Sequence, residues 1–187
     1  MRAYVGLGSN LDDPTAQVRR ALVELLRLPA SRLAGSSRLY RNLAMDLPGQ
    51  PVQPDYVNAV AALDTRLPPQ VLLRLLLKLE LRHQRVRQRR WGPRTLDLDL
   101  LLYGNLRLRR YGLTLPHPGL HLRVFVLYPL AELAPHLVIP GRGRLSPLLT
   151  HRTRRGLHPL PLWQKRDSIP VHPLPLGGMN SDQPPIG

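Results

Sequence analysis

The chain has 187 residues, enough for one domain with its own hydrophobic core, and 43% of them are hydrophobic, which is ordinary for a globular protein. It contains no cysteine, which excludes disulfides, thiol catalysis and cysteine-ligated zinc, and we expect a reducing, cytoplasmic setting. Lysine and arginine number 27 against 12 acidic residues, and this net charge of +15 favours anionic ligands.

Hydrophobic periodicity predicts alternating strands and helices. Asp12 or Asp13 can cap a first helix that has Pro14 at its first position and ends before Pro29, and Pro68-Pro69 opens a second helix. The other expected elements are strands at 2–7, 36–41, 56–65, 95–103, 106–108, 113–115 and 137–139, and a helix at 124–133. The order β-α-β-β-α-β predicts an α+β fold, a ferredoxin-like α-β-α sandwich with a mainly antiparallel sheet.

The composition changes near the C-terminus. Residues 147–187 hold eight of the 21 prolines and show no sustained periodicity. We therefore expect one domain at 1–146, followed by a Pro-rich, disordered basic tail at 147–187. Removing that tail should leave activity nearly unchanged. The apolar run at 70–82 contains Arg74 and Lys78, so we expect no membrane span there.

Two carboxylates interrupt the most apolar of the expected strands. Asp97 and Asp99 stand two residues apart, so they share one face, while Leu96, Leu98 and Leu100 take the other. Like charges this close need a positive partner. Arginines alone would make a structural ion-pair cluster. The alternative, which we prefer, is Mg²⁺, a hard cation that takes carboxylates together with substrate phosphates.

Cations flank the carboxylate pair on both sides. Six arginines and no acid fall within residues 82–94, and His117 and Arg123 come later. Carboxylates, a metal and arginine side chains at one place suit phosphoryl transfer, which needs charge neutralisation and positioning. The chain has no Walker-type phosphate loop. Taken alone, His117 is more typical of a rigid turn, and Glu80 of a solvated helix end.

A few aromatic and amide side chains complete the candidate site. Trp91 stands in a loop rich in Gly, Pro and Arg, where it can close over a flat ligand, although core packing is the alternative. Tyr56 and Phe125 are usually core aromatics. Asn58 lies on the Tyr56 face of an expected strand, and there it needs polar partners that a heterocycle can supply.

Five blocks of sequence carry a family resemblance. AYVGLGSNL (3–11), QPDYVNAV (53–60), RWGPRTLDLDLLLYG (90–104), LPHP (115–118) and RVFVLYPLAELAP (123–135) together resemble the 6-hydroxymethyl-7,8-dihydropterin pyrophosphokinases of folate biosynthesis. The resemblance implies a ferredoxin-like fold and transfer of diphosphate from ATP to the pterin hydroxymethyl group, with release of AMP.

The resemblance also implies roles for single residues. Asp97 and Asp99 would hold two Mg²⁺ ions. The residues that would bind the phosphates are Arg85, Arg87, Arg94, His117 and Arg123. The nucleotide pocket would be formed by Leu73, Glu80, Leu100 and Thr114. Tyr56 and Phe125 would sandwich the pterin, Asn58 would bond its edge, and Trp91 would lie on a closing loop. The implied partners are ATP and the pterin, with neighbouring folate enzymes as further candidates, and we expect a monomer.

The sequence departs from the family pattern at a few positions, and rival functions stay open. The departures are Asn42–Met45 in place of a Thr-Pro-rich loop, Pro118 after the histidine, and Gly112 where a basic residue is usual, for which Arg109 or Arg110 can substitute. A basic nucleic-acid-binding module is one rival, but the strand with Asp97 and Asp99 lacks the aromatics of such a module. The other rival is an inactive scaffold homologue.

Overall fold

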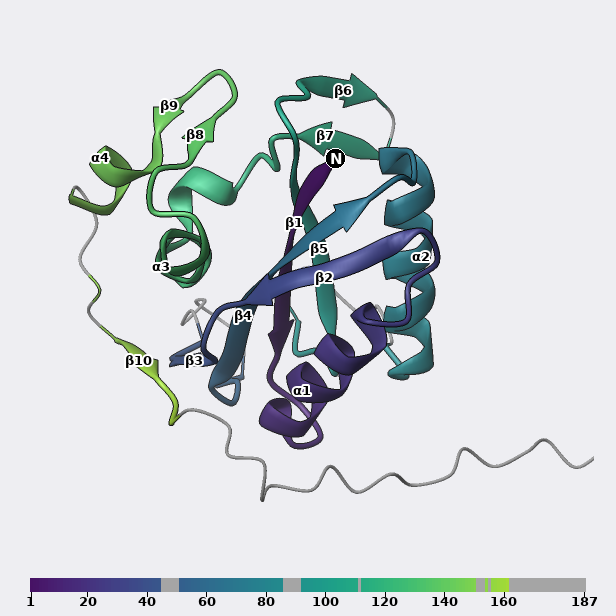
Figure 1. Cartoon of the computed structure of the whole chain (residues 1–187). Coiled ribbons are helices and arrows are strands. Elements are labelled where there is room, and N and C mark those ends of the chain that lie inside the picture. Colours follow the sequence, from purple (N-terminus) through teal and green to yellow (C-terminus); the bar gives the residue numbers. More distant parts are fainter. Residues whose placement is uncertain (45–50, 86–91, 111, 151–153, 155, 162–187) are drawn as a thin grey trace, which may run out of the picture.

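The structure is a computed structural model that describes residues 1–44, 51–85, 92–110, 112–150, 154 and 156–161. Within these residues, six strands form one antiparallel sheet in the order β10-β3-β4-β1-β5, with β2 also paired to β4 (Figure 1). Its strands are β1 (Arg2–Ser9), β2 (Ser31–Ser36), β3 (Tyr40–Asn42), β4 (Tyr56–Thr65), β5 (Asp97–Tyr103) and β10 (Leu157–Pro159). The expected antiparallel α+β fold is confirmed.

Helices cover both faces of this sheet. Helices α1 (Pro14–Leu25) and α2 (Pro69–Arg82) pack on one face, where Val5, Leu98 and Leu100 belong to the core cluster. Helix α3 (Val124–Leu133) packs on the other face, against Tyr4 and Val60. The remaining elements are the 3-10 turn η1 (Leu120–Leu122), α4 (Leu145–Thr150), and the hairpins β6 (Leu108–Arg110)–β7 (Leu113–Leu115) and β8 (Val138–Ile139)–β9 (Gly143–Arg144).

The starts of the two long helices follow the sequence signals. Asp13 is the N-cap of α1, and its carboxylate accepts a hydrogen bond from Ala16 N–H at 3.1 Å, with Pro14 at the first helical position. Helix α2 begins at Pro69 directly after Pro68. Both starts, and the bounds of α3, are as predicted.

The expected strand at 36–41 is wrong in its bounds. The chain instead forms β2, which ends at Ser36, and the three-residue β3, because Ser37 interrupts the ladder: its N–H donates to Val60 O at 2.9 Å, and its hydroxyl accepts from Val60 N–H at 3.0 Å. The Ser37 hydroxyl thus takes the place of a main-chain carbonyl as the acceptor for Val60 N–H. The strand expected at 106–108 is β6, two residues later.

The segment expected to be a disordered tail contains regular structure. Helix α4 crosses residue 147, and β10 joins the main sheet at the outer edge of β3. For these residues the expectation is wrong, because β10 finds main-chain partners that no periodicity in its own sequence reveals. Residues 162–187 lie outside the described residues.

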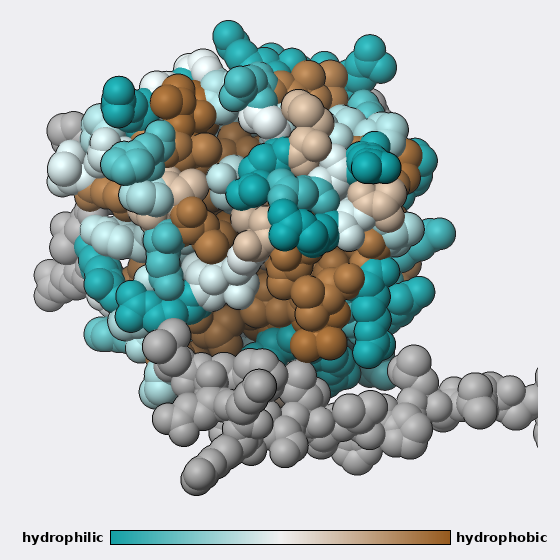
Figure 2. All heavy atoms as spheres, in the orientation of Figure 1, coloured by the Kyte–Doolittle hydropathy of each residue, from teal (hydrophilic) through white to brown (hydrophobic). Residues whose placement is uncertain are grey.

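The surface agrees with the basic composition. In Figure 2, hydrophilic side chains project around much of the outline, and the hydrophobic surface between them is divided into separate areas. Apolar surface scattered in this way is ordinary for a folded domain. No helix in the described part of the chain is both long enough and apolar enough to cross a membrane.

Helix α2 ends in a Schellman motif that places a glutamine where glycine is usual. Arg85 N–H donates to Glu80 O, Gln84 N–H donates to Leu81 O, and Gln84 has φ 56°. A left-handed conformation costs a residue with a Cβ atom about 1–2 kcal/mol. We expect Gln84→Gly to raise the free energy of unfolding by about 0.5–1 kcal/mol, after the entropy cost of glycine, measured by thermal or urea unfolding. Gln84→Ala should bring no gain, and a loss of stability in Gln84→Gly would contradict the reasoning.

Candidate active site

Two glycines of the central strand make room beside the carboxylate pair. In the sheet register, Gly8 lies between Asn58 and Asp97, and Gly6 lies between Val60 and Asp99. Because Val5 and Leu7 face α1 and α2, these glycines fall on the opposite, α3-covered face. A Cβ atom at Gly8 would stand 3.1 Å from Asn58 Oδ1. The absence of side chains here leaves space for a ligand against the sheet.

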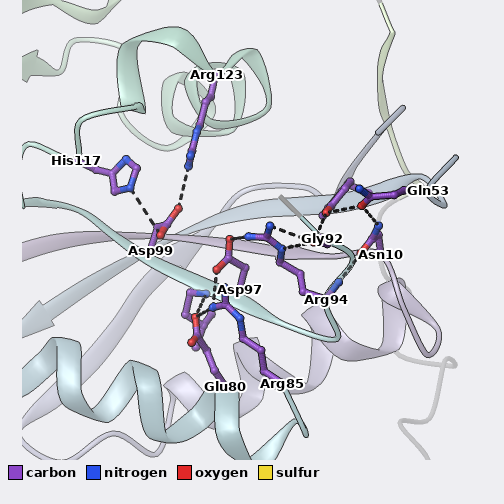
Figure 3. A network of polar contacts seen from close by, with 12 residues as sticks. Asn10, Gln53, Glu80, Arg85, Gly92, Arg94, Asp97, Asp99, His117 and Arg123 are labelled. Carbon is purple, nitrogen blue, oxygen red and sulfur yellow. Dashed lines mark hydrogen bonds and ion pairs between the residues drawn. The ribbon is translucent and has the colours of Figure 1, made fainter. Parts of the chain in front are cut away.

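Each carboxylate of β5 is held by cations from other parts of the chain (Figure 3). Arg85 and Arg94 reach the two oxygens of Asp97 at 2.6 and 2.7 Å. Arg123 donates to Asp99 Oδ2 at 3.0 Å, and His117 Nε2 stands 3.7 Å from Asp99 Oδ1. These cations come from the segment after α2, the segment before β5, the segment after β7 and the start of α3. The fold therefore gathers four separated segments around two aspartates.

Glu80 is part of this network and is not a solvated helix end. It is 3% exposed, accepts a hydrogen bond from Leu98 N–H at 2.8 Å, and pairs with Arg85. Arg85 therefore connects a buried carboxylate to the partly exposed Asp97. Glu80 and Asp97 hold the Arg85 guanidinium from two sides, so Arg85 is already oriented before a ligand binds.

Arg94 is positioned through its main chain. The buried Asn10 accepts from Arg94 N–H at 2.8 Å through Oδ1, and Asn10 N–H donates to Arg94 O at 3.1 Å. The amide of Asn10 also donates to Pro54 O at 3.2 Å. The end of β1 thereby ties the segment before β5 to the segment before β4. No periodicity points to this role of Asn10, so reasoning from the sequence missed it.

His117 is held as a neutral ring with a defined tautomer. Burial lowers the pKa of His117, and Gly119 N–H donates to its Nδ1 at 3.2 Å. A ring nitrogen that accepts carries no proton, so the proton lies on Nε2, the atom that faces Asp99. His117 can therefore offer one N–H donor toward a phosphate oxygen.

Two cavities meet at the carboxylates. The first, of about 590 Å³, lies on the α3 side and is lined by Tyr56, Asn58 and Phe125 among others. The second, of about 1110 Å³, is lined by the α2 residues Leu73, Leu77, Glu80 and Leu81 and by residues of β5 and β7. Arg94, Asp97, Asp99 and Arg123 line both cavities. Two ligands, one in each cavity, would touch each other at the aspartates.

Comparison with known proteins decides the family. A sequence model described as 7,8-dihydro-6-hydroxymethylpterin-pyrophosphokinase (HPPK) matches residues 4–135, well over half of the chain. The chain belongs to the HPPK family. The family expected from the sequence blocks is thereby confirmed, and so is its class of enzyme, an ATP-dependent pyrophosphokinase.

Curated relatives agree in sequence over nearly their whole length. This chain is 49% identical over 160 residues to the 2-amino-4-hydroxy-6-hydroxymethyldihydropteridine pyrophosphokinase of Pseudomonas aeruginosa, covering 86% of this chain and 97% of that protein. It is 45% identical over 147 residues to the protein of the same name from Haemophilus influenzae, covering 79% and 90%. Because each of the two alignments covers most of this chain and most of the relative, the similarity is not confined to one motif.

Solved structures support the fold independently of sequence. A Plasmodium falciparum HPPK-DHPS structure superposes with a TM-score of 0.59 at 11% identity, over 80% of this chain and 43% of that one. A second HPPK-DHPS structure, described as in complex with substrates, gives a TM-score of 0.62 at 10% identity, again over 43% of its length. This chain therefore spans less than half of those proteins, and the likeness supports the shared ferredoxin-like fold.

The structure sorts the expected site residues into two groups. The first cavity gathers Tyr56, Asn58 and Phe125, and the second gathers Leu73, Glu80, Arg85, Leu100, Thr114 and His117. Arg87 and Trp91 lie outside the described residues. Among the departures from the family pattern, Gly112 and Pro118 line the second cavity, and so does Arg110, whereas Asn42 and Leu43 line the first.

Tyr56 is oriented by polar contacts as well as by packing. Burial raises the pKa of its hydroxyl, which therefore keeps its proton and donates to Gln53 Oε1 at 3.3 Å and Gly92 O at 3.4 Å. Gln53 also lines the first cavity. Sequence reasoning missed the two glycines, because the ligand-facing side of a strand leaves no periodic signal when its residues are small, and it missed Gln53 because that residue precedes β4 in a segment without periodicity.

The donor set at the cavity junction fits a hard divalent cation. Nowhere in the described residues do three or more His, Cys, Asp or Glu side chains gather as a ready-made metal site. Asp97 and Asp99 are two carboxylates on one face, with side chains 22% and 32% exposed. Two carboxylates completed by substrate phosphates and water suit Mg²⁺, which seldom takes an all-protein cage.

Proposed function

We propose that this protein transfers the diphosphate of ATP to the hydroxymethyl group of 6-hydroxymethyl-7,8-dihydropterin, releasing AMP, in folate biosynthesis. The family match and the curated relatives support this reaction. The observation that carries it is the junction of the two cavities at Asp97 and Asp99. A transfer between two bound molecules needs their reacting atoms in contact, and this junction is where they would meet.

The larger cavity is the proposed ATP site. Its apolar walls, Leu73, Leu100 and Leu113 among them, suit an adenine ring. Three of its arginines contact the aspartates of the junction: Arg85, Arg94 and Arg123. Arg85, Arg94 and Arg123 would bind the triphosphate oxygens, since a guanidinium matches phosphate geometry with two parallel hydrogen bonds. His117 would add the single donor at Nε2. Arg87 is assigned to the same role from the family resemblance.

The smaller cavity is the proposed pterin site. Tyr56 and Phe125 would lie against the two faces of the bicyclic ring, and Asn58 would bond its amide edge. Arg123 lies 6.0 Å from the centre of the Phe125 ring, so the aromatic wall of this cavity borders directly on the phosphate-binding cations. Trp91 is assigned to a closing loop from the family resemblance.

Asp97 and Asp99 are the proposed ligands of two Mg²⁺ ions. When bound, these ions neutralise phosphate charge and polarise the reacting oxygens. Arg85, Arg94 and Arg123 offset the carboxylates in the structure as it stands, and they would turn to the phosphates once ATP and metal are present. Manganese titration with a nonhydrolysable ATP analogue should give a stoichiometry of two ions per chain, and a stoichiometry of one would reduce the assignment to a single ion.

In the reaction itself, the hydroxymethyl oxygen forms a bond to the β-phosphorus of ATP. The bond from that phosphorus to the oxygen bridging the α-phosphate breaks, the oxygen leaves with AMP, and the hydroxyl gives up its proton. The role of this chain is to align the two substrates and to offset charge on the transferred group, as expected for phosphoryl transfer. Arg94 and Arg123 line both cavities and are therefore placed to act on the group in transit.

The setting of the enzyme is also a proposal. A cysteine-free chain that uses ATP suits the cytoplasm. Because one chain lines both cavities, a monomer suffices for activity. Neighbouring folate enzymes remain candidate partners through the sequence of reactions they share. Light scattering on a gel-filtration column would test the monomer, and a larger species whose dissociation abolishes activity would contradict it.

The reaction is tested by AMP release from purified protein. We expect AMP to form only when ATP, Mg²⁺ and 6-hydroxymethyl-7,8-dihydropterin are all present, and EDTA to stop it, because both substrates must meet at the carboxylates. The diphosphorylated pterin should appear in equal amount by mass spectrometry. Release of AMP or ADP that does not depend on the pterin would overturn the proposed substrate.

A further inference from the structure

A C-terminal strand completes the edge of the sheet next to the smaller cavity. In β10, Leu157 pairs with Asn42, His158 with Arg41 and Pro159 with Tyr40, all antiparallel (Figure 1). Leu160 N–H donates to Leu39 O at 2.8 Å and extends the pairing by one bond. The family match ends at residue 135, so β10 lies outside the part of the chain that defines the family.

Leu157 and Gly156 form part of the cavity wall. Both line the smaller cavity together with Asn42, Leu43 and Asn58. Leu157 is 3% exposed, whereas His158, the next residue on the strand, is exposed on the other face. Gly156 has φ 77°, a left-handed conformation that turns the chain into the strand.

The strand is anchored beyond its ladder. The guanidinium of Arg154 lies 5.7 Å from the centre of the Tyr40 ring and 5.8 Å from that of Tyr128, so it connects the start of β10 to β3 and α3. Tyr40 is buried and donates from its hydroxyl to Glu132 at 2.8 Å. These contacts hold β10 against the domain at a fixed register.

Through Asn42, β10 also affects a proposed pterin-binding group. Asn42 faces Leu157 across the ladder, and its Oδ1 accepts from the side-chain amide of Asn58 at 2.5 Å. This bond fixes which way the Asn58 amide turns, and hence which of its atoms is offered to a ligand. Without β10, the segment at Asn42 and Leu43 would be an open sheet edge.

We propose that β10 is a specificity element of the pterin site, in which Leu157 closes the cavity and, by pairing with Asn42, sets the orientation of Asn58. The inference rests on the proposed function, because it takes the occupant of the smaller cavity to be the pterin. Leu157 is a positioning residue. It touches neither the carboxylates nor the ATP cavity, so its effect should fall on one substrate alone.

The test is Leu157→Ala in the full chain, with His158→Ala as the matched control on the opposite face of the same strand. We expect the KM for the pterin to rise about tenfold, in keeping with the loss of a buried apolar side chain, while the KM for ATP and kcat stay within about twofold. His158→Ala should behave as wild type. Leu157→Met, which keeps the volume, should restore most of the pterin affinity.

Several outcomes would overturn the proposal. An unchanged pterin KM in Leu157→Ala would reject it outright, and so would an equal rise in the KM values for pterin and ATP. A fall in melting temperature without any change in KM would show that Leu157 serves stability alone. These outcomes differ from failure of the proposed function, because they require wild-type protein that turns over the pterin. If the wild-type protein shows no turnover of the pterin, the proposed function and this inference are both rejected.

Discussion

Asp97→Asn should lower kcat by about 10³-fold, or about 4 kcal/mol of activation free energy, with little change in fold. The amide keeps the size of the side chain but carries no charge, so it neither holds a divalent cation nor offsets Arg85 and Arg94, which bond both oxygens of this carboxylate. The side chain is 22% exposed, so the loss of its charge is partly compensated by water. We expect the melting temperature to stay within a few degrees of wild type. Single-turnover AMP formation and a thermal melt measure the two effects.

Asp64→Asn is the matched control for charge. Asp64 accepts from Arg2 and Arg32 on the surface, at 2.7 and 2.8 Å, and lies in neither cavity. It undergoes the same chemical change and loses two arginine contacts, as Asp97 does, so activity should remain at the wild-type level. An Asp97→Asn enzyme with normal turnover and unchanged Mg²⁺ dependence would leave the carboxylate as a structural ion-pair residue only.

The sheet and long helices of this protein could be predicted because they obey local rules. Strand β5 has apolar residues facing α1 and α2, and α1 and α2 begin at proline positions with ordinary signals. The edge of the sheet could not be predicted. Strands β3 and β10 have three residues each, and the pairing of β2, β3 and β10 depends on distant partners such as Thr65, Tyr56 and Asn42, which no local pattern specifies.

The residues of the site fall into the same two groups: those that a local pattern predicts and those that only the fold brings to the site. Asp97 and Asp99 are conspicuous because charge in an apolar strand is costly, and the nearby arginines are conspicuous because they lack acidic neighbours. Glu80 looks ordinary in sequence because its helix end is amphipathic, and only the fold buries it beside Leu98 N–H. Gly6 and Gly8 matter through the side chains they lack. Their role is visible only in the register of the sheet, which places Gly8 between Asn58 and Asp97 and Gly6 beside Asp99.

The C-terminal segment shows where composition misleads. Many prolines and little periodicity predict disorder, and on that basis a cut near residue 150 should be harmless. The structure places β10 on the wall of the smaller cavity, so a cut before residue 154 removes part of that wall, whereas a cut after residue 161 keeps it. A three-residue strand contributes little hydrophobic area of its own and is stabilised by main-chain pairing, which composition does not record.

Arg85→Ala should cost the protein both stability and activity. Glu80 and Arg85 are 4% and 12% exposed in their side chains, so the truncation breaks a buried ion pair while the Glu80 carboxylate stays buried. Breaking a buried pair in this way costs about 3–5 kcal/mol. We expect the lower end, because Leu98 N–H still donates to Glu80. The melting temperature should fall by about 6–12 °C, and kcat by about 10²-fold or more through loss of a phosphate-binding guanidinium.

Arg94→Ala separates the two effects, because Arg94 bonds Asp97 and Gly92 O, whereas the buried pair with Glu80 is made by Arg85. It should lose activity to a similar extent with a much smaller fall in melting temperature. Adding Glu80→Gln to Arg85→Ala removes the buried charge while keeping an acceptor for Leu98 N–H, so stability should recover and turnover should not. If Arg85→Ala melts like wild type, then Glu80 is not held by this pair, and the orientation of Arg85 has another source.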